Sequence, residues 1–240
     1  NYIFATESYH KSNTTIKIRQ MSISIRTTKN DSIIPFNYQG LLAGTLHKWI
    51  GYNGIHNNMS LYSFSWLNGT SINNEGFNCC NGSNWFISFY ENQYIKTIIK
   101  SIISSPDMFC GLTVTDVTIK EDPVFSETKC FKLASPILLK QKIDNHNVVH
   151  VTYKDKDVDR LLENSIRHKM RIANIPEDDT LKITVDKSSV ECKTKFVKIH
   201  DIGNRCFFSP IQIEGRDTTK SFIWNVGLGN STGVGFGAII

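Results

Sequence analysis

The stretch WFISFYENQYIKTIIKSIISSPDMFCGLTVTDVTIK (residues 85–120) contains the signals for a strand, a helix and a second strand in succession. Residues 85–90 form a short apolar run that is typical of a strand. Four isoleucines then recur at the spacing of one helical face: Ile95, Ile98, Ile99 and Ile102. Pro106 follows the helix, and residues 112–120 alternate between apolar and polar side chains. The stretch therefore predicts a β-α-β unit.

The residues before this unit predict a matching one. Residues 21–27 alternate as a strand, and residues 36–50 place five apolar side chains on one helical face: Leu41, Leu42, Leu46, Trp49 and Ile50. Residues 61–67 favour a strand, and a segment rich in Asn, Gly and Ser (68–84) connects them to the strand at 85–90. The order β-α-β-β-α-β is that of the ferredoxin-like fold, in which two helices cover one face of a four-stranded antiparallel sheet.

A second series follows a linker at 121–128. We expect a strand at 130–139, a helix at 155–172, and strands at 181–191, 195–202 and 206–214, with one short closing strand at the end of the chain. The predicted class is α+β with two tandem ferredoxin-like (βαββαβ) domains, 21–124 and 129–240, each with a four-stranded antiparallel sheet. Residues 1–20 are interpreted as an upstream extension or a segment added for expression. A first strand is a further alternative, because residues 16–19 also alternate between apolar and basic side chains.

Composition narrows the functional classes. The 240 residues include 27 Lys and Arg against 22 Asp and Glu, a net charge of +5 that suits a polyanionic partner. The six cysteines form no CxxC pair and have no histidine at zinc-ligand spacing, so neither a metal site nor a cofactor is expected. No signal peptide or bilayer-spanning run is present, which predicts a cytoplasmic protein without a membrane partner.

The last residues carry the sharpest motif, GLGNSTGVGFG (227–237), with five glycines. Dinucleotide and Walker loops need a helix after the glycines, but only residues 238–240 remain. Two interpretations stay open. The bare backbone offers N–H groups to phosphates, or the glycines pack in a tight turn beside a sheet.

This tail resembles the C-terminal glycine-rich signature of the RAMP superfamily, particularly of the Cas endoribonucleases that process CRISPR transcripts. FKLASPI (131–137) resembles the strand that opens the second domain of that family, and LENSIRHK (162–169) resembles the basic helix after it. NYQGLL (37–42) with His47, and then His56, resemble the family's catalytic helix and loop. The resemblance extends over about residues 21–240.

The resemblance implies a metal-independent endoribonuclease that cuts CRISPR precursor RNA within its repeats. The ribose 2′-hydroxyl attacks the adjacent phosphate and leaves 2′,3′-cyclic phosphate and 5′-hydroxyl ends. By position, His47 and His56 become the general acid and base, in either order. The family often supplies a lysine after the loop histidine, but residues 57–64 contain none, so Lys48 is assigned to stabilise charge on the phosphate. Gly44 inside the helix suggests close approach by RNA or by a neighbouring strand.

RNA contacts are expected from the glycine-rich tail and from two basic segments. The tail residues are Gly227, Gly229, Asn230, Ser231, Thr232, Gly233 and Gly235, and the basic residues are Lys193, Lys195, Lys198, Arg160, Arg167 and Lys169. A charge-rich helix is more often a solvated face, so this alternative stays open for the helix residues. The remaining histidines are interpreted as surface or structural residues: His10, His146, His150, His168 and His200.

Two alternatives remain beside the enzyme. The same domains would suit a catalytically inactive subunit that holds CRISPR RNA in an effector complex with other Cas subunits. A single RRM-like RNA binder is disfavoured, because the inner strands lack the basic, glycine and aromatic run of that module. The expected partner is CRISPR repeat RNA, bound by a monomer or homodimer.

Overall fold

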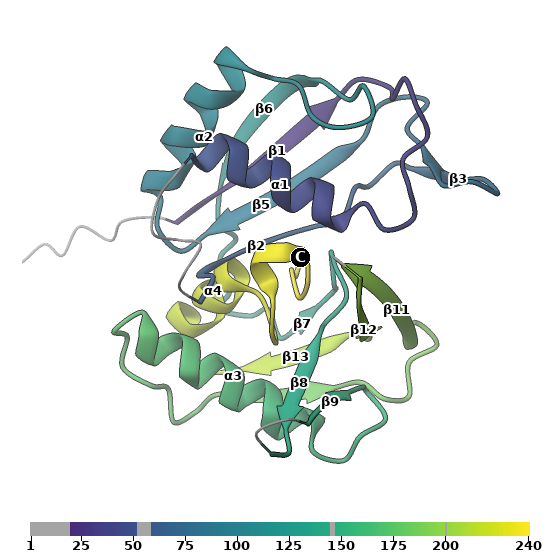
Figure 1. The fold of residues 1–240 in the computed structure, drawn as a ribbon. Coiled ribbons are helices and arrows are strands. Elements are labelled where there is room, and N and C mark those ends of the chain that lie inside the picture. Colours follow the sequence, from purple (N-terminus) through teal and green to yellow (C-terminus); the bar gives the residue numbers. More distant parts are fainter. Residues whose placement is uncertain (1–19, 52–58, 145–146, 200) are drawn as a thin grey trace, which may run out of the picture.

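The computed structural model describes residues 20–51, 59–144, 147–199 and 201–240. It consists of a first half (residues 21–121) and a second half (residues 130–240), with the C-terminal residues between them (Figure 1). Each half has its own hydrophobic core. No helix in the described part of the chain is long and apolar enough to cross a membrane.

The first half follows the predicted order. Its main elements are β1 (Met21–Thr27), α1 (Gln39–Ile50), β2 (Tyr62–Phe64), β5 (Asn84–Phe89), α2 (Gln93–Ser104) and β6 (Val114–Glu121). The sheet order is β2-β5-β1-β6 with antiparallel neighbours, as in a ferredoxin-like fold. A small hairpin, β3 (Ser71–Ile72) and β4 (Phe77–Asn78), lies within the connection before β5.

Alternation along the strands explains which face of the first sheet is covered. Ile23 and Ile25 of β1 pair with Ile87 and Trp85 of β5, and all four side chains are fully buried. Both helices cover this face (Figure 1), and the aliphatic stripe of α2 packs into the same core. Because side chains point to opposite faces of a strand in turn, the serines of β1 face the other side of the sheet.

The second half repeats this plan with shorter strands. Its elements are β7 (Cys130–Phe131), α3 (Val158–Ile172), β10 (Lys182–Val185), β13 (Ile211–Glu214) and α4 (Asp217–Val226), and its sheet order is β10-β13-β7. Lys132 and Ile240 exchange both backbone hydrogen bonds, at 2.9 and 2.8 Å, so the last residues lie at the other side of the β7 segment. This position completes the second βαββαβ series and confirms the predicted fold class.

Several predicted boundaries in the second half are wrong. The strand expected at 206–214 is two strands, β12 (Ile202–Phe208) and β13, separated at Ser209 and Pro210. β12 pairs with β11 (Lys193–Ile199) in a hairpin outside the three-stranded sheet, and β8 (Leu139–Lys142) and β9 (Val148–Val151) form another. Helix α4 was not predicted, because its apolar residues are contiguous (222–224) and its first turn is polar.

Helix α4 joins the halves. It packs on the face of the first sheet that α1 and α2 leave open. The ring centroids of Trp224 and Phe86 lie 5.6 Å apart in an edge-to-face contact. The buried Ser88 hydroxyl donates to the Asn225 side-chain oxygen at 2.6 Å. Since the glycine-rich tail begins directly after α4, this packing places the tail against the first half.

Candidate functional site

The glycine-rich loop (residues 227–237) is mostly buried between the halves. Only Ser231 is exposed, whereas Asn230 and Val234 are half-buried and the other loop residues are buried. The backbone of the loop is bound on both sides: Asn230 N–H donates to the Leu138 carbonyl at 2.7 Å, and the Trp66 indole N–H donates to the Gly235 carbonyl at 2.7 Å. The loop is therefore a fixed element of the interface between the halves.

Close packing explains why these positions of the loop are glycine. A Cβ on Gly233 would lie 2.2 Å from the Ser60 hydroxyl oxygen, and one on Gly229 would lie 2.5 Å from the Leu138 carbonyl oxygen. Gly237 has a φ of +69°, and its Cβ would lie 1.9 Å from the Leu228 carbonyl oxygen. These contacts support the packed-turn interpretation for the glycines themselves.

Ser231 is the exception within the loop. It has a φ of +58°, which non-glycine residues rarely adopt, and its side chain is exposed at the start of the short 3-10 helix η2 (Thr232–Val234). Ser231 is therefore the point at which the loop reaches solvent. Strained conformations in rigid surroundings cluster at functional sites.

Ser231 lies in a groove of about 490 Å³ that both halves line. The first half supplies Met59 and Ser60, directly before β2. The second half supplies the rest of the lining: Lys140, Ser165, His168, Lys169, Gly229, Asn230, Ser231 and Thr232. The groove thus combines a histidine, two lysines and several hydroxyl groups, a set that can bind a phosphate and move a proton.

His47 is connected to the groove through Tyr62. The His47 Nε2 lies 3.0 Å from the Tyr62 hydroxyl, which in turn lies 3.5 Å from the Gly233 carbonyl oxygen. A carbonyl only accepts, so a Tyr62 hydroxyl that donates to Gly233 must accept its hydrogen bond from His47. Burial raises the pKa of Tyr62, which keeps the hydroxyl neutral at physiological pH. The contact therefore orients the His47 ring.

Lys169 is buried behind the groove. Its ammonium donates to the Val226 and Gly227 carbonyls at 2.9 Å each, at the C-terminal end of α4. It also lies 3.5 Å from the Thr232 hydroxyl. Burial lowers the pKa of Lys169 to about 7. This side chain holds both ends of the bend that presents Ser231.

The other predicted catalytic residues are placed differently. His56 lies outside the described residues, and the description resumes at Met59 and Ser60 of the groove. Lys48 is next to His47 in sequence but donates to the Asp107 carbonyl, and its ammonium lies 5.7 Å from the Trp49 ring. The structure does not bring Lys48 into the groove. Gly44 has open space around its Cα within the described part of the chain, so no strand described there accounts for it.

The predicted RNA-binding cations are largely engaged within the protein. The Lys193 ammonium lies 5.0 Å from the ring centroid of Phe208, and the Lys195 ammonium lies 4.5 Å from that of Trp66. Both are cation–π distances. Lys198 forms an ion pair of 2.8 Å with Asp201. On α3, Arg160 pairs with Asp157 at 3.1 Å, and Arg167 donates to the Asp178 and Leu181 carbonyls.

Three residues of this region were missed in the sequence: Tyr62, Lys140 and His168. His168 belongs to the segment that resembles the family's basic helix, but it was interpreted as a surface or structural residue. Lys169 was predicted as an RNA contact, and the structure places its ammonium on the Val226 and Gly227 carbonyls. Tyr62 and Lys140 lie in unremarkable strands, and only the tertiary fold brings them to the loop. Among the described residues, no group of three or more His, Cys, Asp or Glu side chains could hold a metal ion.

Comparison with known proteins assigns the family. The family model described as CRISPR associated protein Cas6, C-terminal, matches residues 119–239, which include the glycine-rich loop and the second half. The chain belongs to the Cas6 family. This family processes CRISPR repeat RNA. A search of curated proteins found no match.

Solved structures agree on the Cas6 fold. The chain is similar to a CRISPR-associated Cas6 protein (TM-score 0.78, 21% identity, 92% of this chain and 98% of that one). It is also similar to a Cas6-related protein from Pyrococcus furiosus (TM-score 0.79, 20% identity, 92% and 98%). A third match is a RAMP protein described as binding different RNA substrates (TM-score 0.75, 20% identity, 91% and 98%). At these identities the likeness shows the fold, and both halves take part in it.

Proposed function

We propose that this Cas6 protein is an endoribonuclease that cuts CRISPR precursor RNA within its repeats without a metal ion. The reaction takes place where the groove meets His47 and Tyr62. The observation that carries the proposal is the convergence of Met59 and Ser60 before β2, α3 and the glycine-rich loop on one basic groove. Tyr62 connects His47 of α1 to the same loop. Membership of the Cas6 family supports the substrate class.

The chemistry needs a base, an acid and charge stabilisation. The base takes the proton of the ribose 2′-hydroxyl as its oxygen attacks the adjacent phosphorus. The bond from phosphorus to the 5′-oxygen breaks, and the acid protonates that oxygen. The products are a 2′,3′-cyclic phosphate and a 5′-hydroxyl, and a DNA strand would lack the nucleophile. His47 and His56 supply the two proton transfers, in either order.

The groove supplies the charge stabilisation. Lys140 of β8 and His168 of α3 line it together with the exposed hydroxyl of Ser231 in the loop, so donors approach a bound phosphate from three segments of the second half. Such donors stabilise the extra negative charge of the phosphorane if they are held in place before the reaction. The Lys169 contacts hold the loop in this way. Lys48 is directed to the loop after α2 and takes no part in this step.

The test is incubation of the purified protein, in EDTA, with the repeat RNA of its own locus. A matched RNA carries a single 2′-deoxy substitution at the cut site. We expect cleavage of the first RNA only, with a cyclic phosphate on the upstream product. Tight binding of both RNAs without cleavage would leave an RNA-holding subunit and would overturn the proposal.

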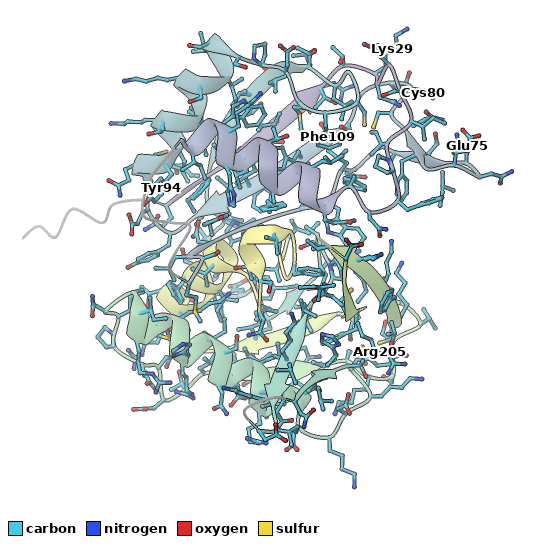
Figure 2. The ribbon with its side chains drawn as sticks, viewed as in Figure 1. Lys29, Glu75, Cys80, Tyr94, Phe109 and Arg205 are labelled. Atoms are coloured by element: carbon cyan, nitrogen blue, oxygen red, sulfur yellow. The ribbon has the colours of Figure 1, made fainter. Side chains whose placement is uncertain are left out.

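Variants separate the role of the two histidines from that of Tyr62. His47→Ala and His56→Ala should each lower the single-turnover cleavage rate by about 100-fold or more. Tyr62→Phe removes one hydroxyl and should lower the rate less, by about tenfold, because the histidine remains but loses its orientation. Tyr94→Phe removes a hydroxyl from α2 and is the matched control (Figure 2).

A further inference from the structure

The two faces of the β11–β12 hairpin have different surroundings. Lys193, Lys195 and Val197 alternate along β11, so they share one face. Lys195 lies over Trp66 of the first half, and Val197 is buried in a cluster with Phe236 of the glycine-rich loop. This face is occupied by the protein itself. On the opposite face Phe207, which pairs with Thr194, is buried, whereas the part around Phe196 and Arg205 is exposed and available to a partner.

The opposite face presents Phe196 and Arg205, which are directly paired across the hairpin. The Phe196 side chain is 69% exposed. Its ring packs on Gly203 of the facing strand, where an added Cβ would lie 2.2 Å from the Phe196 Cζ. The missing side chain of Gly203 therefore lets the ring rest on the backbone, which holds one side of the ring and leaves the remainder in solvent.

Cationic side chains connect this position to the groove. Lys140, which lines the groove, is paired with His150 across the β8–β9 hairpin. The pKa of His150 is lowered, first by burial and then by the charges of Lys140 and Arg205, so all three groups lie near one another. Figure 2 labels Arg205 in the second half, where β12 and β9 are neighbours. Among the described residues, no carboxylate forms an ion pair with Arg205.

We propose that Phe196 and Arg205 bind one unpaired nucleotide of the RNA outside the groove, with the base stacked on Phe196 and the adjacent phosphate on Arg205. This inference rests on the proposed function. A nucleobase fits because the ring stands alone among polar and cationic neighbours, Thr194 and Lys198 along its own strand and Arg205 opposite. A protein partner would favour a contiguous apolar patch.

The first test measures affinity for the uncleavable 2′-deoxy repeat RNA, so that binding is separated from cutting. Phe196→Ala should weaken binding about tenfold, the range of one base–aromatic stack, and Phe196→Trp should retain affinity. Phe196→Ala should leave the salt dependence of binding unchanged, whereas Arg205→Ala should reduce its slope by about 1. Ile72→Ala, at a 71% exposed apolar side chain on the β3–β4 hairpin, is the matched control.

The second test locates the nucleotide. 2-Aminopurine replaces one nucleotide of the repeat RNA at a time, and its fluorescence is measured with and without protein. We expect one position whose fluorescence is quenched by wild type and by Phe196→Trp but recovers in Phe196→Ala. Wild-type affinity and unchanged fluorescence in Phe196→Ala would overturn this inference alone. Failure of the wild-type protein to bind the repeat RNA would overturn both proposals.

Discussion

The two halves of this Cas6 protein share one plan but use it differently. In the first half, the four strands of the shared plan lie in a single sheet, and β6 alone spans eight residues. In the second half, the three named strands of the sheet have two to four residues each, and two hairpins and the glycine-rich loop take up much of the remaining chain. The comparison teaches that the first half is a regular support that holds His47 and Tyr62, whereas the second half uses its chain length to shape the groove.

Glycine substitutions in the two halves give the strongest test of this difference between them. Gly237→Ala places a Cβ against the Leu228 carbonyl at a positive φ, so the free energy of unfolding should fall by about 3 kcal/mol or more. At Gly44 in α1, an added Cβ lies within 4 Å of no atom in the described part of the chain. Gly44→Ala should therefore raise the free energy of unfolding by about 0.5–1 kcal/mol. Urea denaturation measures both. Equal effects at the two positions would contradict the packed role of the loop glycines.

Asp178 tests the same difference between the halves with a buried charge. Its side chain is fully buried and accepts hydrogen bonds from the Arg216 backbone N–H and the Thr219 hydroxyl, which connects the turn before β10 to the start of α4. Asp178→Ala should lower the free energy of unfolding by about 3 kcal/mol, because the donors stay buried without an acceptor. The exposed Asp116 of β6 offers a control, since Asp116→Ala should change the free energy of unfolding by less than about 0.5 kcal/mol.

Asp178 also predicts a pH dependence. Burial alone would raise its pKa, but the hydrogen bonds from Thr180, Arg216 and Thr219 outweigh burial and hold the pKa well below the usual 3.8. A carboxyl group with a lowered folded-state pKa stabilises the protein above pH 3.8 and loses that contribution as the pH falls further. Acid unfolding should therefore be less steep in Asp178→Asn than in wild type below about pH 4. Parallel acid curves would rule out this assignment.

Lys169 predicts a rise of stability with pH as well, in a higher pH range. Its folded-state pKa of about 7 lies below the usual 10.5, so the unfolded chain binds more protons between these values. Stability should then rise with pH from about 7 to 10 in wild type, and rise less in Lys169→Met. Urea midpoints at several pH values measure the difference. An equal rise in both proteins would show that Lys169 is not the group responsible.

The smallest effect is expected at Lys48. Since its ammonium is engaged by the loop after α2, Lys48→Gln should change the cleavage rate by less than about threefold. Single-turnover kinetics at saturating protein measure this. A loss of about 100-fold would return Lys48 to the role of charge stabiliser that its sequence position suggested, and would require a rearrangement of α1 on RNA binding.

The sequence predicted the first half well because its signals are local. Alternation in β1 and the isoleucine stripe of α2 each identify one element without reference to the rest of the chain. The second half was harder, since α4 has a polar first turn and the strand predicted at 206–214 is interrupted at Ser209 and Pro210. The groove depends on contacts between distant segments, such as Tyr62 with Gly233, and no local pattern encodes such a contact.

The glycine-rich loop shows the same limit. Its five glycines stand out in the sequence, but the sequence could not separate exposure to a partner from burial against a neighbour. The structure buries the glycines and exposes Ser231 instead. Burial is a property of the tertiary fold, whereas φ preference is a property of the residue.

The most direct test of the groove as the cutting site is crosslinking of the bound RNA. A 2′-deoxy repeat RNA with 4-thiouridine on either side of the blocked bond would be irradiated in complex with the protein, and the crosslinked peptides identified by mass spectrometry. We predict crosslinks within residues 56–62 and 227–235 and on α3 near His168. Crosslinks confined to the outer strand β6 or to the β3–β4 hairpin would contradict the account.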